Sequence, residues 1–496
     1  MVNNFRLFLL IATYLIIATA AVAAPDNESA KSAAPTSVTA AQAREDISYL
    51  ISTVEDSHPD LYYRATREDY GKAGKGLQQK YAVARGDIKT VSLYRDIAAF
   101  LGVIHDGHTS CSLPLSSDNA RMPFAAKLVG GRLFVDRLLD DSMHVSTGDE
   151  ITAVNGIPAL KYLDGMTKYR SYEVYGRALV SVVNSFSSRG SHENEDLKLL
   201  LKKRDGTIYT AKAVWENVTD KYGMLNPYQP FSFSYLDGIN AGYMRWDTFF
   251  DRRVCGFYAR HGILARMGMQ VDQSKVPDFE DFLHDVFDEL ERRNTPYLIV
   301  DLRENSGGSS LLGNNFISFL TDEKIKDYGG YIKLSSLLKK THGDTYEKLF
   351  ARYPPGSKVT DEQQKELMGE EASIPEFELR KNPQQKYKGK VILLTGYATY
   401  SAAETFTVLM KDNGLAAVAG EPTGNGGNGP IDSLLFSLPN SRINARVSFS
   451  FQTRPSGNQE KEVSPDIRII PTAEDYLAGR DTVLETVKRM IVDKKI

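Results

Sequence analysis

The residues with the clearest chemical potential lie in the stretch from Val391 to Glu404. Five apolar or β-branched residues at 391–395 predict a buried strand, which Gly396 ends. Ser401 then stands where a helix is expected to begin, and backbone N–H groups at a helix start can stabilise a developing oxyanion. Ser401 is therefore a candidate nucleophile. Ser-x-x-Glu is also a capping box, whose only role is to satisfy orphan amides, and this is the commoner explanation of the stretch taken alone.

A second candidate is His108, which closes the segment Ile104-His-Asp-Gly-His. Gly107 permits a sharp turn before it. A neutral imidazole can accept a serine proton near pH 7, so His108 is a candidate general base. Two alternatives stay open at this point: a histidine that only satisfies the turn, and a metal ligand acting with His105 and Asp106. No further ligand cluster supports a metal, and no cofactor is expected.

A third stretch combines a strand with glycines. A buried strand at 296–301 runs into a loop with Gly307 and Gly308, followed by a helix from about 311 to 320. The loop carries no phosphate-binding glycine motif. Glycines also let backbone amides approach a reacting carbonyl closely, which suits an oxyanion hole.

Length and composition indicate a large protein with more than one domain. The chain has 496 residues, 42% of them hydrophobic and 25% charged, which is ordinary for a globular protein. Its formal net charge of -3 gives no basic footprint for nucleic acid. Cys111 and Cys255 could pair after export, but two thiols at this length are not a disulfide scaffold.

The N-terminus predicts export. Arg6 precedes an almost unbroken apolar run at 7–24 that contains the small-residue pattern Ala21-Val22-Ala23. This is typical of a secretory signal peptide at 1–23, and an uncleaved anchor is the alternative. We therefore expect a periplasmic or extracellular protein without stable membrane insertion. An Ala-, Ser- and Thr-rich linker is expected at 24–39.

Around the candidate residues the pattern predicts an α/β multidomain fold. Helical periodicity at 40–115 indicates an N-terminal helical domain. Short strands around glycine turns at 120–214 resemble a PDZ-type β-domain, which can accept a peptide as an added strand, although a plain hairpin with an Asn-Gly turn fits too. An α/β core with parallel crossover strands and an antiparallel extension is expected at 230–496. Within it, 322–390 should be a charged surface insertion.

Several of these motifs, in this order, resemble one family, the tail-specific (C-terminal processing) serine peptidases. The matching stretches are Asp106-Gly-His-Thr109, Asp301-Leu-Arg-x-Asn-x-Gly-Gly308, Ser401-Ala-Ala-Glu404, Gly420-Glu-x-Thr-Gly424 and Val463-Ser-Pro-Asp-Ile467. One branch of the family uses a lysine in the turn that here reads Gly424-Asn-Gly-Gly-Asn428, where no lysine stands. The chain is thus closer to the tricorn-core-like branch, with its serine, histidine and glutamate.

The resemblance implies roles for individual residues. Ser401 would be the nucleophile, His108 the base and Glu460 the acid that orients the base, with Glu462 as second choice. The N–H groups of Ala402 and of Gly307 or Gly308 would form the oxyanion hole. The expected activity is that of an endopeptidase or carboxyl-terminal processing peptidase.

Peptides or unfolded proteins would be the substrates, with no nucleic acid involved. The alternative is a catalytically inactive peptide- or ligand-binding protein on the same scaffold. Substrate sequence and oligomeric state stay open.

Overall fold

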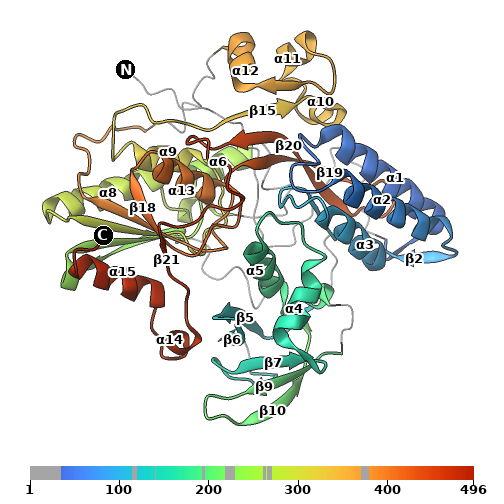
Figure 1. Ribbon diagram of the computed structural model, residues 1–496, viewed down its shortest axis with the longest axis horizontal. Helices are drawn as coiled ribbons and strands as arrows, with labels where there is room; N and C mark the ends of the chain where they lie inside the picture. The colour runs from blue at the N-terminus through green and yellow to red at the C-terminus, as the bar shows by residue number, and fades with distance from the viewer. Residues whose placement is uncertain are drawn as a thin grey trace.

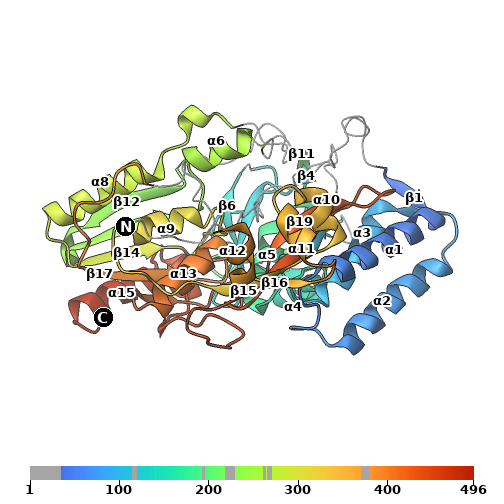
Figure 2. The same cartoon turned by 90° about the horizontal axis from the view of Figure 1, so that it is seen from above.

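The computed structural model describes residues 35–113, 120–139, 141–192, 196–217, 229–260, 264, 271–369 and 379–496. The expected signal peptide and most of the expected linker lie outside these residues. Among the helices described, none is long and apolar enough to cross a membrane. Figures 1 and 2 show an N-terminal group of helices at one end, an α/β core at the other and a β-domain beneath the junction. The expected α/β multidomain class is confirmed.

Three helices make up the N-terminal helical domain: α1 (Ala40–Ser57), α2 (Arg67–Ala82) and α3 (Thr90–Gly102). Thr39 and Gln42 form a capping box that begins α1. The expected linker is wrong at its end, because Ser37–Thr39 forms strand β1 and pairs with β2 (Asp87–Lys89). The apolar stripe of α1, which includes Ile47, is buried against its neighbours. The chain after α3 then leads directly to His108.

The β-domain is an antiparallel sheet with two helices packed on it. Its strand order is β10-β9-β7-β6-β5, with β8 beside β7. The bounds are β5 (Phe124–Val129), β6 (Arg132–Leu138), β7 (Glu150–Val154), β8 (Ile157–Pro158), β9 (Lys198–Lys202), β10 (Ile208–Lys212), α4 (Ala159–Thr167) and α5 (Tyr175–Ser185). Asn155 and Gly156 both have positive φ, as a tight turn between β7 and β8 requires. The loop between α4 and α5 points toward the core (Figure 1).

The core is a mostly parallel sheet with strand order β12-β13-β14-β17-β18-β21. The strands are β12 (Phe231–Leu236), β13 (Ala241–Trp246), β14 (Tyr297–Asp301), β17 (Lys390–Thr395), β18 (Ala416–Gly420) and β21 (Ile467–Arg468). Most apolar contacts on one face come from α6 (Arg252–Arg260), α8 (Phe279–Arg292), α9 (Leu311–Ile317) and α13 (Ala402–Asp412). The other face packs on α15 (Thr482–Val492). Loops at the carboxyl ends of β14 and β17 therefore meet, as ligand-binding loops do in open α/β sheets.

The expectation of a simple surface insertion at 322–390 is wrong. This region supplies β15 (Gly329–Lys333), α10 (Ser336–His342), α11 (Glu347–Arg352), β16 (Lys358–Thr360) and α12 (Asp361–Met368). Strand β15 pairs with β20 (Asn444–Thr453), which pairs in turn with β19 (Gly429–Ser437) and with β3 (Ser110–Ser112). Apolar side chains of this sheet and of α10 share one core with the helical domain. The region packs into a core, instead of lying on the surface, because apolar residues stand between its many Lys and Glu residues.

The two cysteines are free and lie in different cores. Cys255 is buried in α6, whereas Cys111 lies in β3 beside the helical domain. The disulfide left open from the sequence is therefore not formed in this structure. Burial raises the pKa of the Cys111 thiol to about 12, so it is a poor nucleophile in the folded protein.

Candidate active site

Ser401 occupies a strained position between β17 and α13. Its φ of 54° and ψ of -125° lie outside the conformations that a residue with a Cβ normally adopts. Its side chain makes no capping hydrogen bond, and its N–H donates to Oδ1 of Asn425 at 2.6 Å rather than to Glu404. The capping-box explanation is therefore wrong. The buried Ser401 Oγ has no hydrogen-bond partner among the described residues.

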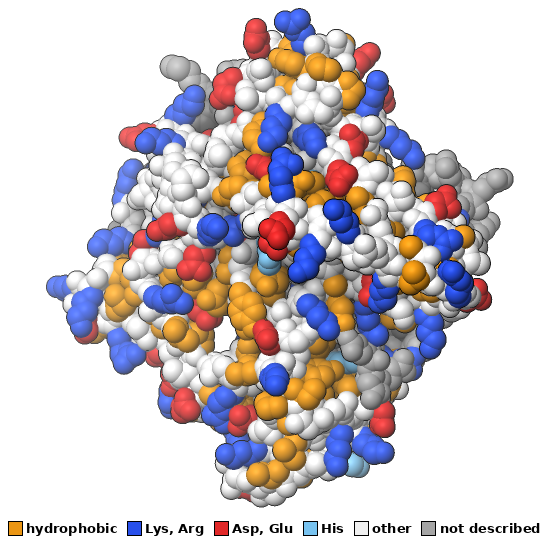
Figure 3. Space-filling model, turned by 45° about the vertical axis from the view of Figure 1, so that its right-hand side comes forward, with side chains coloured by type: hydrophobic (Ala, Val, Ile, Leu, Met, Phe, Trp, Pro, Cys, Tyr) orange, Lys and Arg blue, Asp and Glu red, His pale blue; other side chains and the backbone are white. Residues whose placement is uncertain are grey.

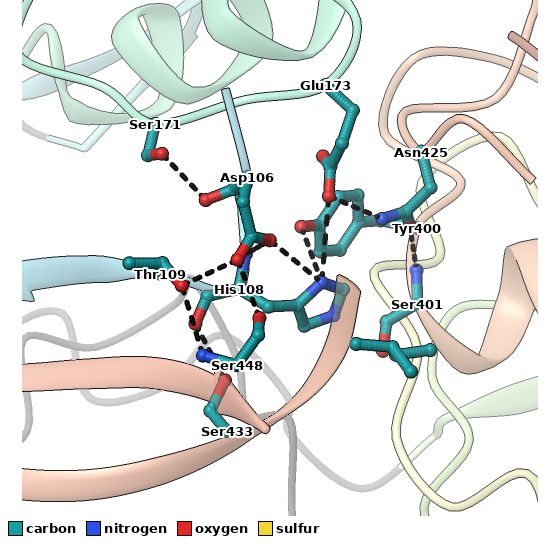
Figure 4. A network of polar contacts seen from close by, with 12 residues as sticks. Asp106, His108, Thr109, Ser171, Glu173, Tyr400, Ser401, Asn425, Ser433 and Ser448 are labelled. Carbon is teal, nitrogen blue, oxygen red and sulfur yellow. Dashed lines mark hydrogen bonds and ion pairs between the residues drawn. The ribbon is translucent and has the colours of Figure 1, made fainter. Parts of the chain in front are cut away.

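His108 is fully buried beside this serine. Its ring stacks on the ring of Tyr400, with centroids 5.1 Å apart and planes 20° apart, and the Tyr400 hydroxyl lies 3.3 Å from Nδ1. Nε2 is buried and makes no hydrogen bond within the described chain. Figure 4 shows Ser401 on the side of the ring away from Asp106. The two free atoms, Ser401 Oγ and His108 Nε2, are the pair that nucleophilic catalysis requires.

Asp106 holds the turn that presents the imidazole. It accepts hydrogen bonds from four groups: His58 Nε2 at 3.1 Å, the His108 N–H at 2.8 Å, Thr109 Oγ1 at 2.5 Å and Ser448 Oγ at 2.6 Å. Burial alone would raise the pKa of Asp106, but the hydrogen bond and charge of His58 outweigh it and lower the pKa to about 2. Asp106 is therefore a structural carboxylate whose acceptor sites are in use.

Gly107 lets the turn come close to its neighbours. A Cβ at this position would lie 2.3 Å from the Tyr400 hydroxyl oxygen and 2.9 Å from Oε2 of Glu173. Arg446 also donates to the Gly107 carbonyl at 2.8 Å. A glycine is therefore needed here for space as well as for the turn, because any side chain would displace the groups around His108.

Glu173 is the carboxylate nearest the imidazole. It comes from the loop between α4 and α5, and its Oε1 lies 3.7 Å from Nδ1 of His108. The same oxygen accepts a hydrogen bond from Nδ2 of Asn425 at 3.3 Å. Asn425 therefore links the backbone of Ser401 to Glu173, and Figure 4 shows Glu173 above the ring and Ser401 to its right, with Asn425 between them.

The structure does not bring Glu460 to the imidazole, so the predicted triad acid needs correction. Glu460 is exposed on the loop before β21 and makes no ion pair with His108. Glu462, the second choice, accepts a hydrogen bond from Ser464 at 3.3 Å instead. The family spacing placed the acid on this loop, whereas the buried position beside His108 is filled from the β-domain.

Two of the predicted oxyanion residues, Gly307 and Ala402, contact each other beside Ser401. A Cβ on Gly307 would sit 2.9 Å from the Ala402 nitrogen, so the two loops are in contact. The Gly307 N–H, however, donates to Oδ1 of Asn305 at 2.8 Å and is not available. The Ala402 N–H is an orphan at the start of α13, and Gly308, with φ 140°, is the remaining donor. Of the sequence alternatives Gly307 and Gly308, only Gly308 is left as a donor, because the Gly307 N–H is already used.

A metal at His105 and His108 finds no support in the geometry. His105 makes an edge contact with the ring of Tyr172, 5.3 Å between centroids, and burial lowers its pKa. In the described part of the chain, the group with metal-ligand geometry is instead Asp106, His108 and Glu173. Because the oxygens of Asp106 already accept four hydrogen bonds, this carboxylate is poorly suited to ligate a metal ion.

Three contributors to this site were missed in the sequence: Glu173, Tyr400 and Asn425. Tyr400 and Asn425 lie within or near motifs that were recognised, so their positions carried a signal. Glu173 follows a polar segment without any motif, and nothing in the sequence connects it to His108.

Comparisons with known proteins relate this chain to a peptidase family and to solved structures. The model of peptidase family S41 matches residues 264–469. A structure of mature CPAF aligns with a TM-score of 0.67 at 19% identity, covering 92% of this chain and 98% of that one. Mature CPAF complexed with lactacystin gives a TM-score of 0.66 at 18% identity, covering 92% and 99%. These likenesses show a shared fold. Among curated proteins, none matches the sequence.

Proposed function

We propose that this chain, whose residues 264–469 match the model of peptidase family S41, hydrolyses peptide bonds in unstructured polypeptides, with Ser401 as nucleophile and His108 as base. One observation carries the proposal. A strained, buried serine at a helix start lies beside a buried imidazole, and the reactive atoms of both lack other partners among the described residues.

The reaction follows from the placement of these groups. Ser401 Oγ attacks the peptide carbonyl carbon while His108 Nε2 takes its proton. The Ala402 and Gly308 N–H groups stabilise the oxyanion, and each such donor is typically worth about 10²–10³ in rate. The imidazolium then protonates the leaving amine as the C–N bond breaks. Water, deprotonated by the same imidazole, hydrolyses the acyl-enzyme.

Access to this site requires movement. Ser401 is 1% exposed and His108 is fully buried, and the two do not hydrogen-bond to each other in this arrangement. We infer that the structure is a closed form and that a substrate enters when the covering segments separate. An extended, unfolded chain fits such a site better than a folded protein does.

Two finer parts of the proposal, location and recognition of chain ends, go beyond the site. The apolar run behind Arg6 supports export to a periplasmic or extracellular location. The β-domain supports recognition of chain ends by strand addition, as in carboxyl-terminal processing. The family match does not extend to that domain, so its binding role is a separate proposal.

Cleavage of a fluorescently labelled unstructured polypeptide tests the assignment. Ser401→Ala should lower kcat by about 10⁵- to 10⁶-fold, and His108→Ala nearly as much, because nucleophile and base act as a unit. Ser52→Ala, at an exposed serine of α1, is the matched control and should leave the rate unchanged. Full activity of Ser401→Ala would remove the nucleophile assignment. A wild-type protein that binds the polypeptide without cleaving it would favour the inactive binding protein.

A further inference from the structure

The acid that serves His108 comes from the β-domain. Glu173 lies outside the segment that matches the peptidase family, and its side chain is only 2% exposed. Resting on the proposed function, we propose that Glu173 is the positioning residue of His108, holding the proton on Nδ1 so that Nε2 faces Ser401. Figure 4 shows its carboxylate above the Nδ1 edge of the ring.

The other candidate carboxylates, Asp106 and Glu460, are less suited than Glu173 to accept a hydrogen bond from His108 Nδ1. Asp106 lies 4.0 Å from Nδ1, but its oxygens accept the four hydrogen bonds that fix the turn. Glu460 is exposed and makes no ion pair with the ring. Glu173 Oε2, by contrast, is buried without a hydrogen-bond partner among the described atoms. Glu173 therefore keeps acceptor capacity that it can use for the imidazole.

A carboxylate can only accept, and this fixes the tautomer. With Glu173 beside it, Nδ1 is the ring nitrogen that carries the proton, which leaves Nε2 free to take the proton of Ser401. The carboxylate also stabilises the imidazolium that forms next. The separation of 3.7 Å exceeds the roughly 2.9 Å of a formed hydrogen bond, and such contacts commonly tighten only when substrate binds.

Two arginines and a second buried carboxyl group lie around Glu173. Arg64 donates to its backbone carbonyl at 3.1 Å, and Arg177 from α5 interacts favourably with its charge. Burial, and then the charge of Glu173, raises the pKa of Glu404 to about 8, so Glu404 is mostly neutral at pH 7.

The remaining groups that face the ring are Asp432 and Tyr400. Asp432 is buried on β19, and burial raises its pKa to about 6, with a hydrogen bond to Ser450 and the charge of His108 opposing the shift. Burial also raises the pKa of Tyr400 well above its usual value, so it stays neutral. The Tyr400 hydroxyl lies closer to Nδ1 than Glu173 does, at 3.3 Å against 3.7 Å, but it carries no charge. Asp432 makes no ion pair with the ring among the described contacts.

This assignment makes catalysis depend on docking of the β-domain. The Glu173 carboxylate reaches the site only while the loop between α4 and α5 rests on the core. The hydrogen bond between Asn425 and Glu173 depends on the same docking. The Asn425 amide donates to Glu173 Oε1 and accepts from the Ser401 N–H, so it connects the β-domain to the nucleophile. A domain that leaves the core would take the positioning carboxylate away from the base and would open the route to Ser401.

The test compares Glu173→Gln with Glu460→Gln and Glu462→Gln in the full chain. Glu173→Gln should lower kcat by at least about 10²-fold with little change in KM, while the other two stay near wild type. The acid limb of the kcat profile should move to lower pH, because the imidazolium loses its negative neighbour. Glu173→Asp should recover part of kcat. Thermal unfolding near that of wild type shows that the variants are folded.

Two results would overturn the inference while leaving the peptidase intact. One is wild-type kcat and an unmoved acid limb in Glu173→Gln. The other is a large loss in Glu460→Gln or Glu462→Gln only, which returns the acid to the loop before β21. A proton NMR spectrum of Ser401→Ala adds a readout independent of turnover: a downfield Nδ1–H resonance should be present and should shift on adding Glu173→Gln. Absence of cleavage by the wild type would instead contradict the proposed function.

Discussion

At the scale of single residues, the site depends on the strained backbone conformation of Ser401. Ser401 holds a backbone conformation of a kind that typically costs of order 1–3 kcal/mol and persists only when its surroundings enforce it. Here the Asn425 side chain and the contact with Gly307 supply that enforcement. The strain places Oγ toward the imidazole instead of toward the helix amides.

Gly107→Ala tests how closely the turn must approach. The new Cβ would meet the Tyr400 hydroxyl oxygen at 2.3 Å and Glu173 Oε2 at 2.9 Å, so the ring of His108 should shift. A misplacement of about 1 Å can lower a rate by about 10²-fold, and we expect a loss of that order in kcat. Gly76→Ala in α2, where nothing lies within 4 Å, is the control. Equal rates for the two variants would contradict the packing described.

Glu404→Gln tests the buried neutral carboxyl. Burial, with the charge of Glu173 second, raises the pKa of Glu404 from 4.5 to about 8, so the folded protein keeps a proton that the unfolded chain loses above 4.5. Stability from this group is present below pH 4.5 and is lost as the pH rises toward 8, by up to about 1.4 kcal/mol per pH unit.

Urea unfolding at pH 5, 7 and 9 should therefore show a smaller decline in Glu404→Gln than in wild type. Glu366→Gln, at an exposed position of α12, should follow wild type. Parallel declines in wild type and Glu404→Gln would exclude the raised pKa.

At the scale of elements, helix α5 of the β-domain packs against the loop between β17 and α13, which precedes Ser401. Arg177 lies over the ring of Tyr400 at 4.3 Å, which adds a cation–π contact to the docking. Gly176 comes so close to Tyr397 that a Cβ would lie 2.3 Å from a ring carbon. The start of α5 thus positions the loop before Ser401 as well as Glu173.

Gly176→Ala should weaken this docking without unfolding either part. We expect kcat to fall by about 10-fold or more, because both Glu173 and Tyr400 lose their support. Gly165→Ala in α4 of the same domain has open space around its Cβ and serves as the control. Limited proteolysis should cut between the β-domain and the core faster in Gly176→Ala than in Gly165→Ala. Identical cleavage rates and activities would argue against a docking role for α5.

At the scale of the whole molecule, the site lies where three parts meet. His108 comes from the helical domain, Glu173 from the β-domain and Ser401 from the core. The helical domain is held to the core region by a shared apolar cluster with α10, β15, β19 and β20. Figure 3 shows basic and acidic side chains interspersed over one face, with a small opening to the left of its centre.

Leu338→Ala tests whether the shared cluster stabilises the molecule. Leu338 in α10 is fully buried, and its loss should lower the free energy of unfolding by about 2–5 kcal/mol. Leu435→Ala on β19, where the side chain is 36% exposed, should change it by only about 0.5 kcal/mol. Denaturant unfolding measures both. Equal effects would mean that α10 is the surface excursion expected from sequence.

Sequence reasoning found the parts of the site that carry local signals. Ser401 and His108 stand at a strand-to-helix junction and beside a glycine turn, which patterns can reveal. Glu173 could not be found from the sequence, because its role depends on how the β-domain packs against the core. Local sequence patterns do not predict how domains pack. The region at 322–390 was misjudged for a similar reason, since its apolar residues find partners only in the distant helical domain.

A crystal structure of the protein trapped by a peptidyl phosphonate would show whether the proposed reacting groups converge. We expect a covalent bond to Ser401 Oγ, His108 Nε2 within about 3.2 Å of that oxygen and the phosphonyl oxygen facing the Ala402 and Gly308 N–H groups. A phosphonate attached to another residue, or an imidazole well beyond hydrogen-bond reach of the bonded oxygen, would contradict this expectation.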